Sequence, residues 1–211
     1  GNDELKWETS EQINVGLDAR LFNDRLTLSM DWFNKKTKDL LITGTTPSLI
    51  IGGTTSPINA GNVSNKGFEF EIGWRDNIGD FNYSIKGNLA TLKNKVTYLD
   101  PSLTRANGTT FHTNTITYFE EGYPVYYFRG YRCEGINPED GEPIFADLDN
   151  NGIINEDDKT YIGDAIPDFT YGLTLTAAWK GLDLTIFGSG SYGNDVFSCI
   201  NRPDHASANK L

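Results

Sequence analysis

The chain of 211 residues is long enough for one large β domain or two small ones, and its formal net charge is −11 at pH 7. An acidic chain without a basic stripe argues against nucleic acid as a partner and against docking on anionic lipid surfaces. No segment approaches the roughly 18 continuous apolar residues of a transmembrane helix.

The first predicted element is a hairpin in which apolar residues alternate along 13–21 and again along 26–32. Pairing Leu21 with Leu26 across a tight turn places an apolar residue opposite an apolar one along the whole hairpin. The polar residues between them then share the other face. Because side chains alternate with period two, a slip of one residue would exchange the two faces, so this register is strongly specified.

The second predicted hairpin turns at residues 76–79, with alternating apolar residues on both sides of the turn. With Trp74 beside Phe81, apolar residues face each other along both strands. This register also sets Glu69 opposite Lys86, which makes an attractive cross-strand ion pair.

The third predicted hairpin joins residues 169–179 to a strand that begins at Leu182, around a turn at Lys180-Gly181. Like the other two turns, it contains residues that tolerate positive φ, as short hairpins require. One or two further strands are expected within residues 113–133.

Three features of these hairpins predict an all-β fold, namely an antiparallel transmembrane β-barrel wall. The alternating runs extend for about 9–11 residues, the span of a tilted transmembrane strand. Aromatic residues gather near the strand ends, as in the girdles of such barrels. Short turns close one rim, whereas the other rim opens into long segments at 35–65, 92–123 and 134–167. The predicted architecture is therefore a meander of long hairpins with short turns on one rim and long loops on the other.

The two faces of this wall have different expected surroundings. The residues expected to touch hydrocarbon rather than a second protein layer include Leu17, Met30, Ile72 and Leu175. The residues expected to line a polar interior are Asp18, Arg20, Asp31, Glu69, Glu71, Arg75 and Lys86. The alternative is a soluble secreted β-sandwich, a glycan-binding or adhesive module stabilised by calcium, which requires the apolar faces to bury against a second sheet.

Residues 147–158 have the spacing of a calcium-binding loop, with side-chain oxygens at positions 1, 3 and 5 and a glycine at position 6. The predicted ligands are Asp147, Asp149, Asn151, the carbonyl of Ile153, Asn155 and Asp158. The loop has aspartate where an EF-hand prefers glutamate at position 12, and helical flanks are not evident. We predict a structural Ca²⁺ here, and the alternative is an acidic Asn-Gly turn without metal.

No group of residues predicts catalysis, and the chain is expected not to be an enzyme. His112 and His205 lie in polar, loop-like sequence. Residues 188–193 match the dinucleotide-binding pattern but end a strand, where that motif needs a helix to follow. Cys133 and Cys199 both fall near the long-loop rim, where an extracytoplasmic compartment permits either a disulfide or two free thiols.

Eight segments of the sequence form a recognisable pattern when they are taken together in chain order, although no single one is diagnostic. They are Leu5–Gln12, Asn14–Asp18, Asp39–Leu41, Asn59–Glu69, Glu121–Pro124, Phe128–Tyr131, the 147–158 loop and Pro167–Leu173. In this order they resemble the C-terminal barrel region of SusC-like TonB-dependent outer-membrane transporters, and the resemblance covers nearly the whole chain.

The resemblance implies a single-chain barrel of about 22 strands that holds an N-terminal plug. It places the barrel in the bacterial outer membrane with the long loops extracellular. It implies import of oligosaccharides or peptides, driven by the TonB complex, with a SusD-like surface lipoprotein as partner. The aromatic residues within 123–131 and the calcium-like loop are the expected contacts for partners.

This chain departs from the pattern of a complete transporter. Residues 1–211 show no plug, TonB box or signal peptide, and they end at Leu211 without a terminal aromatic strand. The predicted strands are too few to close such a barrel, and open edges would leave backbone groups unpaired in hydrocarbon. We therefore expect a piece of a larger barrel, in which the TonB complex is contacted through a part outside this segment.

Overall fold

The computed structural model describes residues 5–43, 57–111 and 114–198, where almost all regular structure is β-strand. A single-turn 3-10 helix, η1 (Glu156–Asp158), precedes β13. No helix in the described part is long and apolar enough to cross a membrane. The strands are β1 (Thr9–Leu21), β2 (Leu26–Thr43), β3 (Pro57–Ile78), β4 (Phe81–Thr91), β5 (Lys93–Leu99), β6 (Ala106–Asn107), β7 (Thr110–Phe111), β8 (Asn114–Thr115), β9 (Thr117–Phe119), β10 (Tyr127–Tyr131), β11 (Cys133–Ile136), β12 (Pro143–Phe145), β13 (Lys159–Gly163), β14 (Phe169–Trp179) and β15 (Leu182–Tyr192).

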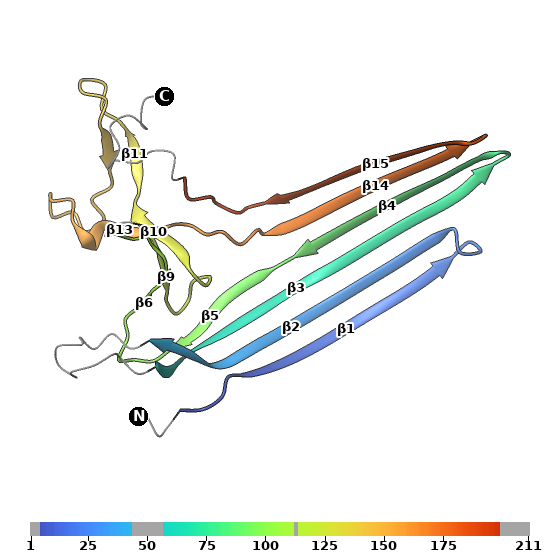
Figure 1. Cartoon of the computed structure of the whole chain (residues 1–211). Helices are drawn as coiled ribbons and strands as arrows, with labels where there is room; N and C mark the ends of the chain where they lie inside the picture. Colours follow the sequence, from blue (N-terminus) through green and yellow to red (C-terminus); the bar gives the residue numbers. More distant parts are fainter. Residues whose placement is uncertain (1–4, 44–56, 112–113, 199–211) are drawn as a thin grey trace.

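The dominant element is one long antiparallel sheet of order β1-β2-β3-β4-β14-β15, in which β5 also pairs with β3. The three hairpin turns lie together at one end, and all other connections leave from the opposite end (Figure 1). This arrangement confirms the predicted meander of long hairpins. The sheet is open in the described part of the chain, and β1 and β15 are its edges.

The predicted registers of the first and third hairpins are confirmed. Leu21 lies opposite Leu26 in the first, and Trp179 lies opposite Leu182 in the third. Asn23 and Lys180 adopt positive φ angles of 57° and 46° in the two turns. Such turns match the twist of the strands that they join.

The predicted register of the second hairpin is wrong. Phe81 lies opposite Ile78, so β3 runs further toward the turn than expected, and Glu69 and Lys86 are not partners. Gly79, with a φ of 60°, supplies the left-handed residue of this tight turn. The shift moves partners by an even number of residues, so every side chain keeps its face. Apolar alternation alone therefore cannot separate the two registers.

The strands extend further than predicted on the long-loop side. β2 has 18 residues and β3 has 22, about twice the 9–11 that cross a membrane. The segment 35–65 was expected to be a loop, but β2 continues to Thr43 and β3 begins at Pro57. The sheet therefore projects well beyond its apolar band at this end.

Residues 100–111 and 114–167, which we call the rim lobe, contain several short strands where mostly long loops were predicted. Four short strands form a sheet of order β13-β10-β9-β6, and β11–β12 and β7–β8 form two hairpins. One or two strands were predicted within 113–133, and the structure has three there, β8, β9 and β10. The buried core lies where the rim lobe meets β3 and β5 and consists of Ala60, Val63, Val96, Leu99, Leu103, Ala106 and Phe119.

The apolar face of the long sheet is uncovered. Leu17, Met30 and Ile72 are 66%, 49% and 39% exposed, and none belongs to the buried core. The soluble β-sandwich alternative requires a second sheet over this face, and the described residues provide none. A continuous apolar face of this length needs a non-aqueous partner.

Candidate functional site

The polar face of the long sheet is hollow. A concavity of about 720 Å³ lies on this face near the short turns. Charged residues on its lining are Asp18, Arg20, Asp24, Arg25, Glu71, Arg75 and Lys86. A second hollow further along the same face is lined by Asp31, Glu69 and Glu71, among others. All seven residues predicted to face a polar interior therefore lie on these concave surfaces, as they would inside a barrel.

Charges of both signs are fixed on this face by short contacts. The Ser29 hydroxyl donates to an oxygen of Asp18 at 2.7 Å. The Arg75 Nε donates to the carbonyl of Asp24 at 3.0 Å, which ties β3 to the first turn. A surface of this kind holds water or packs against other polar protein.

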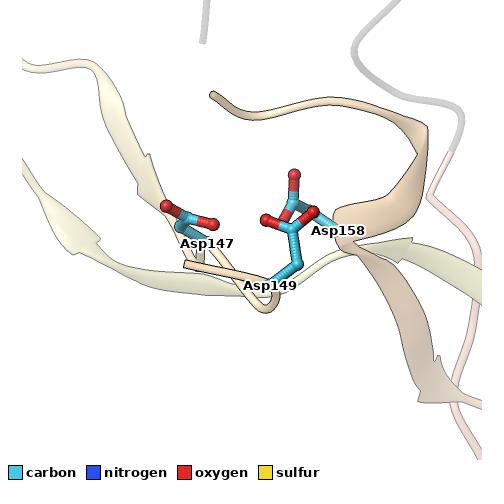
Figure 2. A group of neighbouring side chains, drawn as sticks. All are labelled: Asp147, Asp149 and Asp158. Atoms are coloured by element: carbon cyan, nitrogen blue, oxygen red, sulfur yellow. The ribbon is translucent and has the colours of Figure 1, made fainter. Parts of the chain in front are cut away.

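The calcium-like loop brings three of its six predicted ligands together. Candidate ligand oxygens of Asp147, Asp149 and Asp158 all lie within 4.8 Å of one another (Figure 2). The three side chains come from the segment between β12 and β13. Asn150 and Gly152 adopt positive φ angles of 59° and 81°, which bend the chain sharply between these carboxylates.

Asp158 is the organising residue of this loop. It is fully buried, its Oδ1 accepts from the backbone of Leu148 at 2.8 Å, and its Oδ2 accepts from the backbone of Asn155 at 2.8 Å. Asn155 in turn caps η1 by accepting from Asp157. This capping box was not predicted, although the residues Asn-Glu-Asp-Asp are its sequence signal.

The other predicted ligands shape the loop around the carboxylates. The Asn151 side chain donates to Asp149 at 2.7 Å, and the Asn155 side chain donates to the carbonyl of Ile153 at 3.5 Å. The backbone of Gly152 donates to Asp147 at 2.7 Å, and this hydrogen bond holds the pKa of the Asp147 carboxyl below its usual value. The Asp147 carboxylate is therefore ionised at neutral pH.

The donor set fits a hard divalent cation. Three carboxylates converge, and no lysine or arginine in the described part of the chain forms an ion pair with any of them. Oxygen ligands from a loop of this spacing are the type that Ca²⁺ prefers. A bound Ca²⁺ would offset two carboxylate charges and fix the bend of the loop.

The rim lobe contains a cluster of stacked tyrosines. The rings of Tyr123 and Tyr127 stack with centroids 4.6 Å apart, and Tyr161 stacks on both. Burial and the hydrogen bond from the Tyr127 hydroxyl to Glu120 raise the pKa of Tyr127 well above its usual value. Tyr127 is therefore buried within the rim lobe, whereas Tyr123 and Tyr161 remain partly exposed. The sequence indicated aromatic residues within 123–131 but not Tyr161, which joins them through the pairing of β10 with β13.

The thiol of Cys133 is exposed and donates to the carbonyl of Gly135 at 3.2 Å. The sequence left open a disulfide between Cys133 and Cys199, but Cys199 lies outside the described residues. His112 and His205 also lie outside them.

Comparisons with known proteins point in one direction. The model of the family described as TonB dependent receptor-like, beta-barrel, matches residues 1–204. The TonB-dependent receptor P3 of Formosa agariphila is 36% identical over 93% of this chain and 22% of its own length. The TonB-dependent receptor SusC of Bacteroides thetaiotaomicron is 28% identical over 93% of this chain and 20% of its own length.

Solved structures of a peptide transporter are also similar to this chain. The RagAB peptide transporter is similar with a TM-score of 0.78 and 28% identity, over 92% of this chain and 22% of the transporter chain. The open-open state of the RagAB peptide importer has a TM-score of 0.77 and 29% identity. The chain therefore spans about a fifth of the length of the relatives that it matches.

Proposed function

Because the chain belongs to the TonB-dependent receptor-like β-barrel family, we propose that it forms part of the wall and rim of an outer-membrane importer. The observation that carries this proposal is the long sheet with one exposed apolar face and one hollow, charged face. In hydrocarbon the first face is solvated by lipid tails, and the second lines a wet or plugged interior. The open edges at β1 and β15 then require neighbouring strands from the rest of a larger barrel.

The cargo of the proposed importer is an oligosaccharide or a peptide. RagAB is named a peptide transporter, and SusC is a second relative from the same family. In this proposal the segment does not contact the TonB complex, which drives import through another part of the protein. The relatives are named receptors and transporters, so a non-catalytic role stays our prediction for this chain.

A SusD-like surface lipoprotein is the proposed partner at the rim lobe. The long connections of outer-membrane barrels face the extracellular side, which would place the rim lobe outside the cell. The exposed faces of Tyr123 and Tyr161 and the apolar β11–β12 hairpin, with Ile136 and Ile144 exposed, are the surfaces available for that contact.

Uptake by cells tests the proposed function. We expect cells lacking the gene for the whole protein to lose accumulation of either labelled oligosaccharides or labelled peptides, each supplied as a defined size-fractionated pool. An uncoupler that collapses the proton gradient should abolish the same uptake in wild-type cells. Unchanged accumulation of both pools in the deletion strain would overturn the importer proposal.

We further propose that residues 147–158 hold a structural Ca²⁺ through the ligands named above. Ca²⁺ should stabilise the whole detergent-solubilised protein, by about 2.7 kcal/mol at a free concentration 100-fold above Kd. Asp147→Ala is expected to abolish the difference in melting temperature between Ca²⁺ and EDTA. Differential scanning calorimetry measures both.

The matched control for this prediction is Asp157→Ala. Asp157 lies in the same loop, but its carboxylate is not part of the converging group. It should keep the full calcium-dependent shift. A wild-type protein whose unfolding is the same in Ca²⁺ and EDTA would contradict the calcium proposal and favour a metal-free acidic turn.

A further inference from the structure

Five of the 18 lysine and arginine residues lie together on the apolar side of the long sheet, just beyond its apolar band. They come from β2, β3 and β5, and the strand register brings them into neighbouring rows. One row contains Ile13, Asn34, Lys66 and Lys93, the next contains Glu11, Lys36, Ser64 and Lys95, and a third pairs Thr9 with Lys38. These rows lie at the long-loop end of the sheet.

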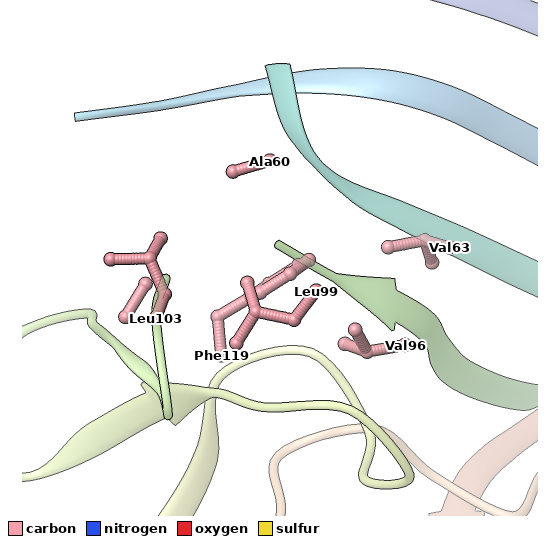
Figure 3. Packing of buried hydrophobic residues seen from close by; sticks show 7 residues of the cluster. Ala60, Val63, Val96, Leu99, Leu103 and Phe119 are labelled. Atoms are coloured by element: carbon pink, nitrogen blue, oxygen red, sulfur yellow. The ribbon is translucent and has the colours of Figure 1, made fainter. Parts of the chain in front are cut away.

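The alternation of each strand fixes the side to which these lysines point. Lys66 shares its face with Phe68, two residues along β3. The residues of β5 that alternate with its lysines point the other way. Asn94 accepts from the backbone of Val125 at 2.7 Å, and Val96 lies in the core beneath the rim lobe (Figure 3). The lysines therefore face outward, where the apolar band meets lipid.

The depth of the lysines can be estimated from strand geometry. Trp32 and Phe68 form the last large apolar pair before the lysine rows. At about 3.4 Å per residue and a tilt of about 40°, Lys66 lies roughly 5 Å beyond this pair along the membrane normal, and Lys36 and Lys95 lie roughly 10 Å beyond it. This is the depth of lipid headgroups.

Four of these five lysines form no close ion pair within the described residues, although Lys36 lies opposite Glu11 in the register. Lys38 pairs with Glu11 at 2.7 Å. Within the described residues, the other four form no ion pair, and Lys66 lies directly opposite Lys93. Like charges directly opposite each other destabilise a sheet. An external anion bound between them would reverse this effect.

A groove provides space for such an anion. It has a volume of about 600 Å³, and Trp32, Lys66, Phe68 and Lys93 line it together with Asp164 and Asp168. Asp164 accepts from the hydroxyl of Tyr161, and neither aspartate forms an ion pair with a lysine of the groove. The groove thus brings Trp32 and Phe68 together with two lysines, and its lining also includes Asn94, Pro124 and the two aspartates.

We propose that Lys36, Lys66, Lys93 and Lys95, the lysine patch, bind the phosphate groups of a lipid in the outer leaflet, which in an outer membrane are those of lipid A. The proposal rests on the proposed function, since it needs the apolar face in the membrane and the rim lobe outside. The overall charge of −11 hides this patch, because its lysines are separated in the sequence and meet only through cross-strand pairing. At this rim the proposal departs from the prediction, made from the overall charge, that the chain does not dock on anionic lipid.

Native mass spectrometry of the whole, delipidated protein in detergent tests the proposal with bisphosphorylated lipid A as the probe. K66Q/K93Q is expected to weaken lipid A binding roughly 30-fold, from the contribution of two lysines. The matched control K35Q/K180Q removes two lysines outside the patch, one on the polar face of β2 and one in a short turn, and should bind as the wild type does. Dephosphorylated lipid A should bind weakly to all three proteins.

Three outcomes would overturn the lipid proposal. These are equal lipid A affinity for K66Q/K93Q and the control, equal binding of dephosphorylated lipid A, or full displacement of lipid A by millimolar inorganic phosphate, which would indicate a site for free phosphate. Removing the opposed charges should not impair folding, and heat-modifiable migration in gels checks that each variant is a folded barrel. A wild-type protein that needs no detergent would instead refute the proposed function, so the two failures are distinguishable.

Discussion

Met30→Arg is expected to destabilise the barrel by about 2–4 kcal/mol, the effect of an arginine on the lipid face near the bilayer midplane. Met30 lies on the apolar face opposite Leu17 in β1 and Phe70 in β3. Met30 lies between Trp32 and Leu26 in β2, and its partner Leu17 is central in the alternating apolar run 13–21, so an arginine there is placed within the apolar band. Urea-dependent unfolding of the whole protein from lipid bilayers measures the change in free energy.

The control for this substitution is its neighbour. Ser29 lies on the polar face between Asp18 and Glu71, so Ser29→Arg introduces the same side chain beside two carboxylates. We expect this variant to unfold within about 1 kcal/mol of the wild type, because a surface ion pair contributes little. Equal destabilisation by the two substitutions would mean that the two faces do not differ in environment.

Gly67→Ala is expected to destabilise the protein by about 3 kcal/mol, because the added methyl group has no space. A Cβ at residue 67 would lie 1.9 Å from the carbonyl oxygen of Thr91 and 3.0 Å from the ring of Phe33. A backbone oxygen cannot move aside as a flexible side chain can. Thr91 also accepts from the backbone of Phe68 at 2.9 Å, so the clash falls where β4 ends and β5 takes over its place beside β3.

Gly87→Ala is the matched control on the adjacent strand. A Cβ there would meet Ile72 at 3.6 Å, an ordinary van der Waals contact. The control should therefore unfold within about 0.5 kcal/mol of the wild type, as most unstrained substitutions do. Denaturant midpoints and the heat-modifiable fraction report both variants. Similar stability of Gly67→Ala and the wild type would show that β3 and β4 separate more easily than their pairing indicates.

The faces of the six long strands could be predicted from the sequence because apolar and polar residues mostly alternate along them. This local signal assigns Leu17 and Asp18 to opposite faces without any knowledge of neighbouring strands. It does not distinguish registers that differ by an even number of residues, which is why the pairing of the second hairpin was wrong. The two-residue turn at Gly79-Asp80 decides that register, and the sequence was also compatible with the four-residue turn predicted at 76–79.

The rim lobe could not be predicted because its strands are short and depend on distant partners. β9 has three residues and β10 has five, and β10 pairs with β13 across the intervening calcium-like loop. The calcium-like loop was predictable, since its residues are consecutive and its geometry is local. The lysine patch was not, since Lys36, Lys66 and Lys93 become neighbours only through the register of three strands.

The central claim is that lipid touches the apolar face of the long sheet and water or protein touches the other. Spin labels at single cysteines introduced into the whole, otherwise cysteine-free protein in bilayers test this claim directly. Labels on the apolar face should be relaxed by oxygen and shielded from a water-soluble nickel chelate; these positions are Leu17, Met30, Ile72 and Leu175. Labels on the polar face should be relaxed less by oxygen; these positions are Asp18, Ser29, Glu71 and Thr174. The account is contradicted if the first four labels are accessible to nickel or shielded from both reagents as in a protein core.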